Sequence, residues 1–297
     1  MIGIALQYLP SAAEAAKRLG LRLRLPVHEI AVHRFPDEEL RVTVGAAAKI
    51  TIVFASLHQP NDKLLALLFA CEALRRGGAE RLVLVAPYLC YMRQDAVFHQ
   101  GEAISQKVIG PLLARIFDRV VTVDAHLHRT ANVRDVFPGI EADDLSAMPA
   151  VAETLRAGID PQTIIVGPDE ESRAWVSDLA ARLGLDVVVA SKSRRGDRAV
   201  EMTFPDPARL ANRPALLVDD IVSSGATLSA CAKALQSAGA TAIDGVVTHA
   251  LFPPELVGAL LAAGIRSIKS TDSVPHPTNA IALDGLLADA LRKECDA

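Results

Sequence analysis

The 297-residue chain has few aromatic residues, little net charge and no long uninterrupted apolar run. Aromatic residues make up 4% of the chain, which leaves little material for the stacking platforms of proteins that bind single-stranded nucleic acid. The formal net charge of −4 gives no basic surface for nucleic acid either. Arg, Asp or Glu interrupts each apolar stretch before it reaches membrane-spanning length, so no membrane segment is expected.

Cysteine is also scarce, and its four occurrences show no metal-ligand spacing. Each lies in or beside an apolar run, which is typical of reduced thiols in a cytosolic protein. The N-terminal sequence Met-Ile-Gly-Ile-Ala-Leu lacks a basic leader and a cleavage site, so no signal peptide is expected. These features together predict a cytoplasmic protein.

What is abundant is apolar sequence, at 51% of residues, arranged in short runs that alternate with helical patterns. Strands are expected at residues 50–55, 81–86, 119–123, 163–166, 186–190, 215–218 and 243–248. Helices are expected at residues 11–19, 63–76, 103–117, 149–156, 171–183, 228–238 and 254–263, with a closing helix from 284 to 292. This alternation predicts an α/β fold with mainly parallel sheets.

The pattern also runs twice along the chain. The stretch Val120-Val-Thr-Val-Asp124 resembles Ala215-Leu-Leu-Val-Asp219, since each is an apolar strand that ends in a carboxylate. We therefore expect two domains, 1–145 and 146–297, related by pseudo-twofold symmetry, with the active site between them. A second arrangement stays open, in which the last helix packs against the first domain. The length of the chain is comfortable for two domains.

The most informative stretch runs from Pro214 to Leu228. An apolar strand ends in Asp219 and Asp220, and a small hydroxyl-rich loop then leads into a helix. Backbone N–H groups and hydroxyls at a helix N-terminus bind phosphate well. Because carboxylates would repel that phosphate, they are better suited to sugar hydroxyls or to Mg²⁺. The alternative is a buried strand capped by a Ser/Thr turn.

Other stretches carry weaker signals. In Arg34-Phe-Pro-Asp-Glu-Glu-Leu40, a phenylalanine beside carboxylates could stack on a base, although a Pro-containing turn between strands explains the same residues. Arg93 offers a planar fork for phosphate or a purine, although an Arg–Asp surface pair with Asp95 is the plain alternative. His126 follows a strand and could bind a metal or a phosphate, although a lone histidine more often has a structural role.

Ser191-Lys-Ser-Arg-Arg195 does not fit a helical pattern and favours a mobile hairpin after the strand at 186–190. Cations that close over a diphosphoryl group in transfer would stabilise its spread negative charge. The alternative is a solvated basic loop, and the residues from Arg194 to Arg198 are the most loop-like basic stretch.

These stretches, in this order, resemble the ribose-phosphate pyrophosphokinase (phosphoribosyl-diphosphate synthetase) family over roughly residues 3–292, in its short archaeal-type class. The resemblance implies two phosphoribosyltransferase-type domains. It implies ATP binding by Phe35, Asp37 and Glu39, supplied by a neighbouring subunit, and by Arg93, Gln94 and Asp95. It implies a ribose 5-phosphate site formed by Asp219, Asp220, Ser223, Ser224, Gly225, Ala226 and Thr227. It also implies catalytic roles for Lys192 and Arg194, and Mg²⁺ near His126 and Asp169.

The implied reaction transfers the diphosphoryl group of ATP to O1 of ribose 5-phosphate, in a homodimer or larger assembly. Two alternatives stay open, a phosphoribosyltransferase and a catalytically impaired regulatory homologue of such a synthetase. Glu170, Glu171 and Ser223 favour the regulatory homologue, because many family members have small residues or an acid at those positions. Ala226 replaces a common glycine and requires a negative φ.

Overall fold

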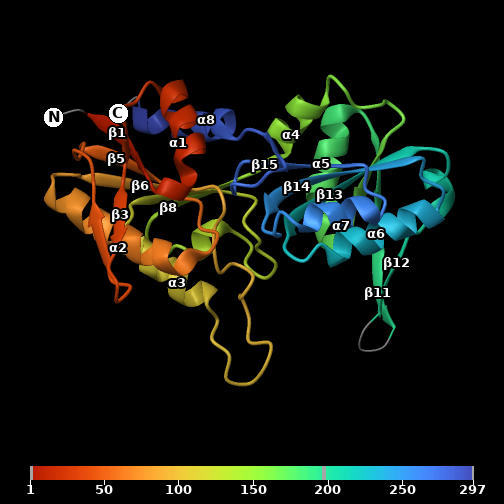
Figure 1. Cartoon of the computed structure of the whole chain (residues 1–297), viewed down its shortest axis with the longest axis horizontal. Coiled ribbons are helices and arrows are strands. Elements are labelled where there is room, and N and C mark those ends of the chain that lie inside the picture. Colours follow the sequence, from red (N-terminus) through yellow and green to blue (C-terminus); the bar gives the residue numbers. More distant parts are fainter. Residues whose placement is uncertain (1–2, 196–198, 296–297) are drawn as a thin grey trace. The chain divides into compact units, whose positions relative to one another are not determined.

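The computed structural model describes the backbone of residues 3–195 and 199–295, with side chains outside 192–201. The chain divides into two compact units (Figure 1). Unit 1 contains the residues up to Leu145 and those from Leu283 onward, and unit 2 is Ser146–Ala282. We expected the second domain to run to residue 297. The structure instead groups the C-terminal segment with unit 1, the arrangement allowed above for the last helix.

Unit 1 is built on a six-stranded sheet that is parallel throughout. In spatial order its strands are β2 (Val27–Glu29), β1 (Ile4–Tyr8), β5 (Ile50–Phe54), β6 (Arg81–Ala86), β7 (Arg119–Val123) and β8 (Glu141–Leu145). In Figure 1, helices α1 (Ala13–Leu23) and α8 (Asp284–Cys295) lie on one side of this sheet, and α2 (Pro60–Arg76) and α3 (Gln106–Ala114) on the other. A separate antiparallel hairpin joins β3 (Ala31–Arg34) to β4 (Leu40–Thr43).

Unit 2 also has a six-stranded parallel sheet. Its order is β10 (Asp186–Val189), β9 (Ile164–Gly167), β13 (Pro214–Val222), β14 (Ala242–Ala250), β15 (Ser267–Thr271) and β16 (Asn279–Ile281). Helices α4 (Met148–Leu155) and α5 (Arg173–Leu183) lie on one side, and α6 (Ala226–Ser237) and α7 (Leu256–Ala262) on the other. The hairpin here joins β11 (Ser191–Arg195) to β12 (Ala199–Thr203).

The two units therefore repeat one topology. In each, a hairpin follows the edge strand, so that β3–β4 corresponds to β11–β12, and β5 corresponds to β13. The helix that follows the last strand of each repeat packs in the other unit: α4 follows β8 and contacts α5, whereas α8 follows β16 and contacts α1. The expectation of an α/β chain with two mainly parallel sheets is confirmed.

Burial explains why these segments become strands. Helices cover both faces of a parallel sheet, so its central strands are apolar on both faces rather than alternating. All five residues of β7 are buried, and so are the last four of β5. In unit 2 the core between the sheet and α6 includes Leu217, Val247 and Cys231. Among the described residues, no helix is both long enough and apolar enough to cross a bilayer.

The main strands and helices lie close to their expected positions, but seven strands were not predicted from the sequence: β1, β2, β3, β4, β8, β15 and β16. The shortest, β2 and β16, have three residues each, too few for a periodic pattern to show. β8 carries three carboxylates in five residues, which hides its role as an edge strand.

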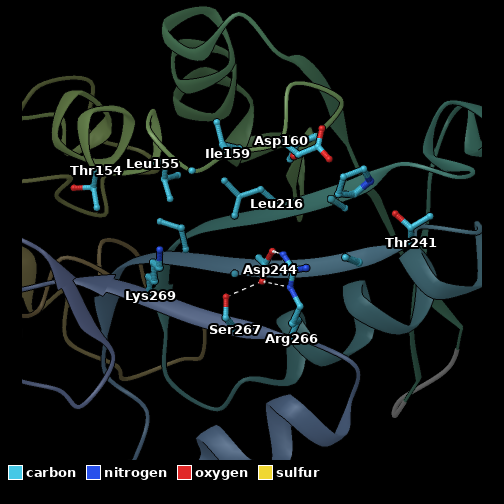
Figure 2. Close-up of a pocket in the computed structure, with 17 residues that line it drawn as sticks. Thr154, Leu155, Ile159, Asp160, Leu216, Thr241, Asp244, Arg266, Ser267 and Lys269 are labelled. Atoms are coloured by element: carbon cyan, nitrogen blue, oxygen red, sulfur yellow. Dashed lines mark hydrogen bonds and ion pairs between the residues drawn. The ribbon is translucent and has the colours of Figure 1, made fainter.

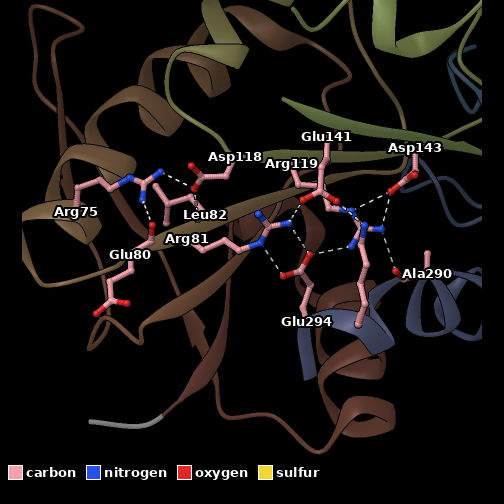
Figure 3. Close-up of polar contacts among 11 residues, drawn as sticks. Arg75, Glu80, Arg81, Leu82, Asp118, Arg119, Glu141, Asp143, Ala290 and Glu294 are labelled. Carbon is pink, nitrogen blue, oxygen red and sulfur yellow. Dashed lines mark hydrogen bonds and ion pairs between the residues drawn. The ribbon is translucent and has the colours of Figure 1, made fainter. Parts of the chain in front are cut away.

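The C-terminal helix α8 is held on unit 1 by a buried ion-pair network (Figure 3). Glu294 and Arg119 have side chains only 4% and 3% exposed, and Arg119 Nη1 donates to Glu294 Oε1 at 3.0 Å. Arg81 Nε donates to Glu294 Oε2 at 2.8 Å, and Arg119 Nε donates to Asp143 Oδ2 at 2.8 Å. At the start of the helix, Arg22 Nε donates to Asp284 Oδ2 at 2.6 Å.

These contacts set the protonation of Glu294. Burial alone would raise the pKa of this carboxyl, but hydrogen bonds from Arg81 and Arg119 outweigh burial and leave the pKa below its usual value. Since the folded-state pKa is lowered, the contribution to stability is present at neutral pH. It is lost as acid protonates the carboxylate.

We predict that Glu294→Gln destabilises the protein by about 3 kcal/mol at pH 7, because it leaves buried guanidinium charge without its main partner. Chemical denaturation followed by circular dichroism at pH 7 and pH 4 measures the effect, which should shrink at the lower pH. Glu72→Gln is the matched control, since the Glu72–Arg76 pair is exposed to solvent and contributes little to stability. Equal losses in the two variants would show that the buried network does not stabilise α8.

Candidate functional site

The stretch from Asp219 to Thr227 lies where expected, at the C-terminal end of β13 and the start of α6. Gly225 is the residue before the helix and has φ 70°, in the left-handed region. A Cβ at this position would lie 2.8 Å from Leu256 Cδ2, the end of a flexible side chain, so it is chiefly the backbone angle that favours glycine. Ala226 is the first helical residue and is not among the residues with positive φ. The condition set above for Ala226 is therefore met.

The loop presents donors at the N-terminal end of a 12-residue helix. Ser223 and Ser224 are exposed, and Ala226 N is 3.5 Å from Ser224 Oγ. The free N–H groups of the first helical turn carry partial positive charge, which suits an anion. The phosphate-binding role of Ser223, Ser224, Gly225, Ala226 and Thr227 remains a prediction with compatible local geometry.

Three carboxylates gather at the C-terminal ends of two neighbouring strands. Asp219 and Asp220 lie near the end of β13, and Asp169 follows its neighbour β9. The pKa of Asp219 is raised well above its usual value, first by burial and then by the negative charges of Asp220 and Asp169. The buried Cys231 thiol in α6 experiences the same environment, since burial and the charges of Asp219 and Asp169 raise its pKa to about 12. This concentration of negative charge is suited to a cation or to hydroxyl donors.

The loop after β9 neutralises part of its own charge. Asp169 Oδ1 accepts a hydrogen bond from Ser172 N at 3.2 Å, which starts a short 3₁₀ turn before α5. Glu170 pairs with Arg173 through two hydrogen bonds, one from Nε and one from Nη2 at 2.7 Å. The hydrogen bond from Arg173 lowers the pKa of Glu170. The extra acidic residue at this position is therefore matched by a cation within the same loop.

In unit 1, Phe35, Asp37 and Glu39 form the turn of the β3–β4 hairpin. Phe35 N donates to Glu39 O at 2.8 Å, and Glu39 N donates to Asp37 Oδ1 at 3.3 Å. The Phe35 side chain is 38% exposed, with its ring 4.8 Å from the His33 ring in an edge-on arrangement. The Pro-containing turn considered above is thus present. It leaves the Phe35 ring partly exposed, with the Arg41 guanidinium over the ring at 5.8 Å from its centroid.

Two contacts join this hairpin and the loop after β6 to the start of α2. Arg34 forms an ion pair with Asp62, and Tyr91 Oη donates to Asn61 Oδ1 at 2.5 Å. The structure therefore brings the Phe35 hairpin and the Tyr91 loop to the same helix end. Sequence reasoning did not single out Asn61 and Asp62. The sequence feature that could have identified them is an Asn-Asp pair directly after Pro60, the residue that begins the helix after β5.

The three expected ATP-binding residues of the second loop differ in their surroundings. Arg93 is exposed and forms no ion pair among the described residues, so its guanidinium is available. Asp95 is buried, and its carboxylate accepts from Arg129 Nη1 at 2.8 Å and from Arg129 N at 3.2 Å. The backbone carbonyl of Gln94 accepts from Gln106 N at 3.2 Å. Asp95 thus anchors its loop to the chain that follows β7, a role that the sequence did not indicate.

His126 lies just after β7 and contacts His128 both through a ring nitrogen and through the rings, whose centroids are 3.8 Å apart. Among the described residues, no three His, Cys, Asp or Glu side chains converge into a metal-binding group. Mg²⁺ usually takes only one or two protein carboxylates and completes its shell with phosphate oxygens and water. The carboxylates near Asp219 fit that mode of binding, in which a nucleotide supplies further ligands.

Lys192 and Arg194 lie on β11, so the expected hairpin is present. Arg194 pairs with Val200 in the hairpin rather than lying in a loop, which corrects the expected start of the basic loop. The side chains of both cations, and residues 196–198 altogether, lie outside the described residues.

A parallel sheet of this order, with an acidic pair and a hydroxyl-rich loop at the start of the next helix, defines a phosphoribosyltransferase-type domain. Both sheets of this chain have this order, and the acidic pair and the loop lie in unit 2. Residues 146–252 match the family model of the phosphoribosyl transferase domain. Residues 4–116 match the model for the N-terminal domain of ribose phosphate pyrophosphokinase. The chain belongs to the ribose-phosphate pyrophosphokinase family, whose members are transferases.

The similarity extends over almost the whole chain. The chain is 32% identical in sequence to ribose-phosphate pyrophosphokinase 2 of Archaeoglobus fulgidus, over 94% of this chain and 97% of that protein. It is 30% identical to the ribose-phosphate pyrophosphokinase of Methanopyrus kandleri, over 93% and 94%. The fold is similar to that of phosphoribosylpyrophosphate synthetase from Mycobacterium smegmatis, with a TM-score of 0.84, 23% identity and 98% coverage of both chains.

We predict that Asp219→Asn raises the melting temperature at pH 7 in the absence of divalent cations. The raised pKa means that ionised Asp219 is disfavoured in the folded state, so wild type loses stability as pH rises through that pKa. The asparagine variant escapes this loss, and its advantage should narrow at pH 4 or on addition of Mg²⁺. Calorimetry at both pH values, with and without MgCl₂, measures it.

The control variant for this prediction is Asp178→Asn. Asp178 is a partly exposed residue of α5 that forms an ion pair with Arg182. Its substitution should change the melting temperature little and should not respond to Mg²⁺. A lower melting temperature for Asp219→Asn at pH 7 would contradict the inferred repulsion among the three carboxylates.

Proposed function

We propose that this protein transfers the diphosphoryl group of ATP to O1 of ribose 5-phosphate, giving 5-phosphoribosyl 1-diphosphate and AMP. Membership of the ribose-phosphate pyrophosphokinase family supports this reaction. The observation that carries it is the β13–α6 loop, where an acidic pair and a helix N-terminus provide complementary surfaces for a sugar phosphate.

In this proposal, unit 2 binds ribose 5-phosphate. Asp219 and Asp220 accept hydrogen bonds from the ribose hydroxyls, and Ser223, Ser224, Gly225, Ala226 and Thr227 surround the 5-phosphate. A hydroxyl donor or a cation next to Asp219 would stabilise its ionised form and so lower the raised pKa of this carboxyl. Asp169 is placed on the neighbouring strand end, next to this acidic pair, where it would contribute to a magnesium site.

Unit 1 binds ATP in this proposal. The exposed ring of Phe35 stacks on the base, while Asp37 and Glu39 accept from its exocyclic amine. Arg93 has no ion pair among the described residues and would contact phosphate. Asp95 and Gln94 fix the loop that carries Arg93. The Asp95 carboxylate accepts a hydrogen bond from Arg129 N, and the Gln94 carbonyl accepts one from Gln106 N. His126 would lie at the phosphate side.

Mg²⁺ is the proposed cofactor, and it would neutralise charge on the phosphates of the nucleotide. The chain's own contribution is alignment of O1 with the β-phosphorus and stabilisation of the transferred group by Lys192 and Arg194. Glu170 does not exclude this role, since its charge is paired with Arg173. That pairing is why the synthetase is preferred over an impaired regulatory homologue.

The decisive experiment is incubation of the protein with ATP, Mg²⁺ and ribose 5-phosphate, with products identified by mass spectrometry. The proposal requires AMP and 5-phosphoribosyl 1-diphosphate in equal amounts, and no AMP when ribose 5-phosphate is omitted. A phosphoribosyltransferase would instead consume 5-phosphoribosyl 1-diphosphate when a base is added. Absence of both reactions would support the regulatory alternative.

We predict that Lys192→Ala lowers kcat on the order of 10²–10³-fold with little change in either KM, because its charge acts on the transition state. Steady-state kinetics of the purified variant measures this. Lys107→Ala, a substitution of an exposed lysine on α3, is the control and should match wild type. A kcat for Lys192→Ala within about threefold of wild type, or ~0.7 kcal/mol of barrier, would remove Lys192 from the mechanism.

We further propose a homodimer or larger assembly, in which the Phe35 hairpin reaches a neighbour. Apolar side chains are exposed on this hairpin and on α2, which contacts β4: Val32 36%, Phe35 38%, Leu65 48% and Phe69 46%. Such a group of exposed apolar residues is typical of a protein interface.

Phe69→Glu should therefore shift sedimentation velocity profiles from dimer or larger to monomer and reduce activity in parallel. Leu21→Glu is the matched control, because Leu21 is 82% exposed on α1, on the other side of the sheet. It should leave both the assembly and the rate unchanged. A wild-type protein that is monomeric and fully active at assay concentration would contradict the proposed assembly.

A further inference from the structure

Unit 2 contains a cavity of about 450 Å³ at the edge of its sheet where β13, β14 and β15 begin. Figure 2 shows Thr154 and Lys269 toward one end of the group of lining side chains and Thr241 toward the other. The acidic pair and the phosphate-binding loop lie at the opposite edge of the same sheet, where β13 ends. The cavity is therefore separate from the proposed ribose 5-phosphate site. Its volume is within the usual range of about 300–1,000 Å³ for small-molecule sites.

The repeated topology explains why this space exists. In unit 1 the last turn of α8 places Glu294 against Arg81 and Arg119, the first residues of β6 and β7. The corresponding strands of unit 2 are β14 and β15. The corresponding helix, α4, has 8 residues where α8 has 12, and its last residue Leu155 lines the cavity. The cavity thus occupies the position that a further helical turn and its carboxylate fill in unit 1.

The wall of the cavity holds a guanidinium in a fixed plane. Arg266 donates to both oxygens of Asp244, from Nε to Oδ1 at 3.1 Å and from Nη2 to Oδ2. Ser267 Oγ also donates to Asp244 Oδ1, at 2.7 Å. The Arg266 side chain is 68% exposed, so the flat face of the paired guanidinium is open to a planar ring. The buried apolar side chains of Leu216 and Val246 line the same cavity and add apolar surface for that ring.

The charges of the remaining polar residues define the rest of the ligand. Lys269 is exposed and forms no direct ion pair among the described residues, although its charge helps to lower the pKa of Asp244, so its ammonium can still bind an anion. The equivalent residue of β7 in unit 1, counted from the start of each strand, is the buried Val121. Asp160 lies at the rim with a carboxylate oxygen that accepts from Gln162 N at 2.8 Å, which leaves acceptor capacity for hydroxyl groups.

We propose that this cavity is a binding site for a nucleoside monophosphate. The base stacks on the Arg266 plane over Leu216 and Val246, the phosphate pairs with Lys269, and the sugar hydroxyls donate to Asp160. A ligand with only an anion would leave the apolar wall unused, and a ligand with only a ring would leave Lys269 unpaired. Both features of the cavity are satisfied when one molecule carries a planar base and a phosphate.

The test uses AMP as the probe and hydrogen exchange of the full-length protein as the readout, because exchange reports where the ligand binds. AMP should protect the amides of residues 241–246 and 266–269, at the start of β14 and β15. Any protection near residues 219–227 reports the proposed active site and is counted separately. Protection confined to the active-site loops would overturn the proposal. This result does not depend on turnover, so it distinguishes failure of this site from failure of the proposed reaction.

Three variants sharpen the test. Lys269→Ala should weaken AMP binding at this site by about tenfold or more, while adenosine, which lacks the phosphate, should bind both proteins equally. Thr154→Trp, on the exposed rim of α4, should fill the cavity and abolish the protection of 241–246. Lys233→Ala, an exposed lysine of α6 on the other side of the sheet, is the matched control and should change nothing.

Two further outcomes would overturn the proposal. If Lys269→Ala and Lys233→Ala bind AMP equally at this site, the phosphate is not recognised by Lys269. If Thr154→Trp changes the sedimentation coefficient but not AMP binding, the cavity is part of an interface between copies of the chain. The basal rate with ATP and ribose 5-phosphate should remain at the wild-type value in Lys269→Ala, since Lys269 lies outside the proposed catalytic residues.

Discussion

The parallel direction of every strand in the two main sheets is the constraint on which the rest of the structure depends. Parallel strands need crossover connections, so the C-terminal ends of all the strands in a unit lie along one edge. Asp169 and the pair Asp219–Asp220 come from different crossovers and still meet, because β9 and β13 are neighbours. The Tyr91 loop and the start of α2 meet in unit 1 for the same reason.

That gathering of loops has an energetic cost. Burial and like charge disfavour ionised Asp219, so the arrangement is less stable alone than with a partner that compensates its charge. Other charges are compensated within the chain, as in the Glu170–Arg173 pair of the loop that also carries Asp169, and in the Arg119–Glu294 pair that holds α8. The contrast distinguishes carboxylates that are paired within the fold from those that we propose bind a ligand.

The sequence predicted the α/β class and the central strands, because buried parallel strands are continuous apolar runs. It did not predict β8, whose sequence Glu-Ala-Asp-Asp-Leu is that of an exposed edge, or strands of three residues. At the site, the order of motifs located the Asp219–Thr227 loop. The bond from Arg129 to Asp95 could not be predicted from the sequence, because it joins residues 34 positions apart. The role of Glu170 was equally hidden until its partner Arg173 was visible.

Each repeat contributes its last helix to the other unit, α4 to unit 2 and α8 to unit 1. As a result, unit 2 can be completed before unit 1 during synthesis. Unit 2 is one continuous segment, from Ser146 to Ala282, and has all its parts as soon as β16 has left the ribosome. Unit 1 begins first but lacks α8, so Arg119 has no Glu294 beside it until α8 has been synthesised. The unit that is begun first is therefore the last to be completed, and in a nascent chain α1 lacks its α8 partner on that side of the first sheet while the second unit forms.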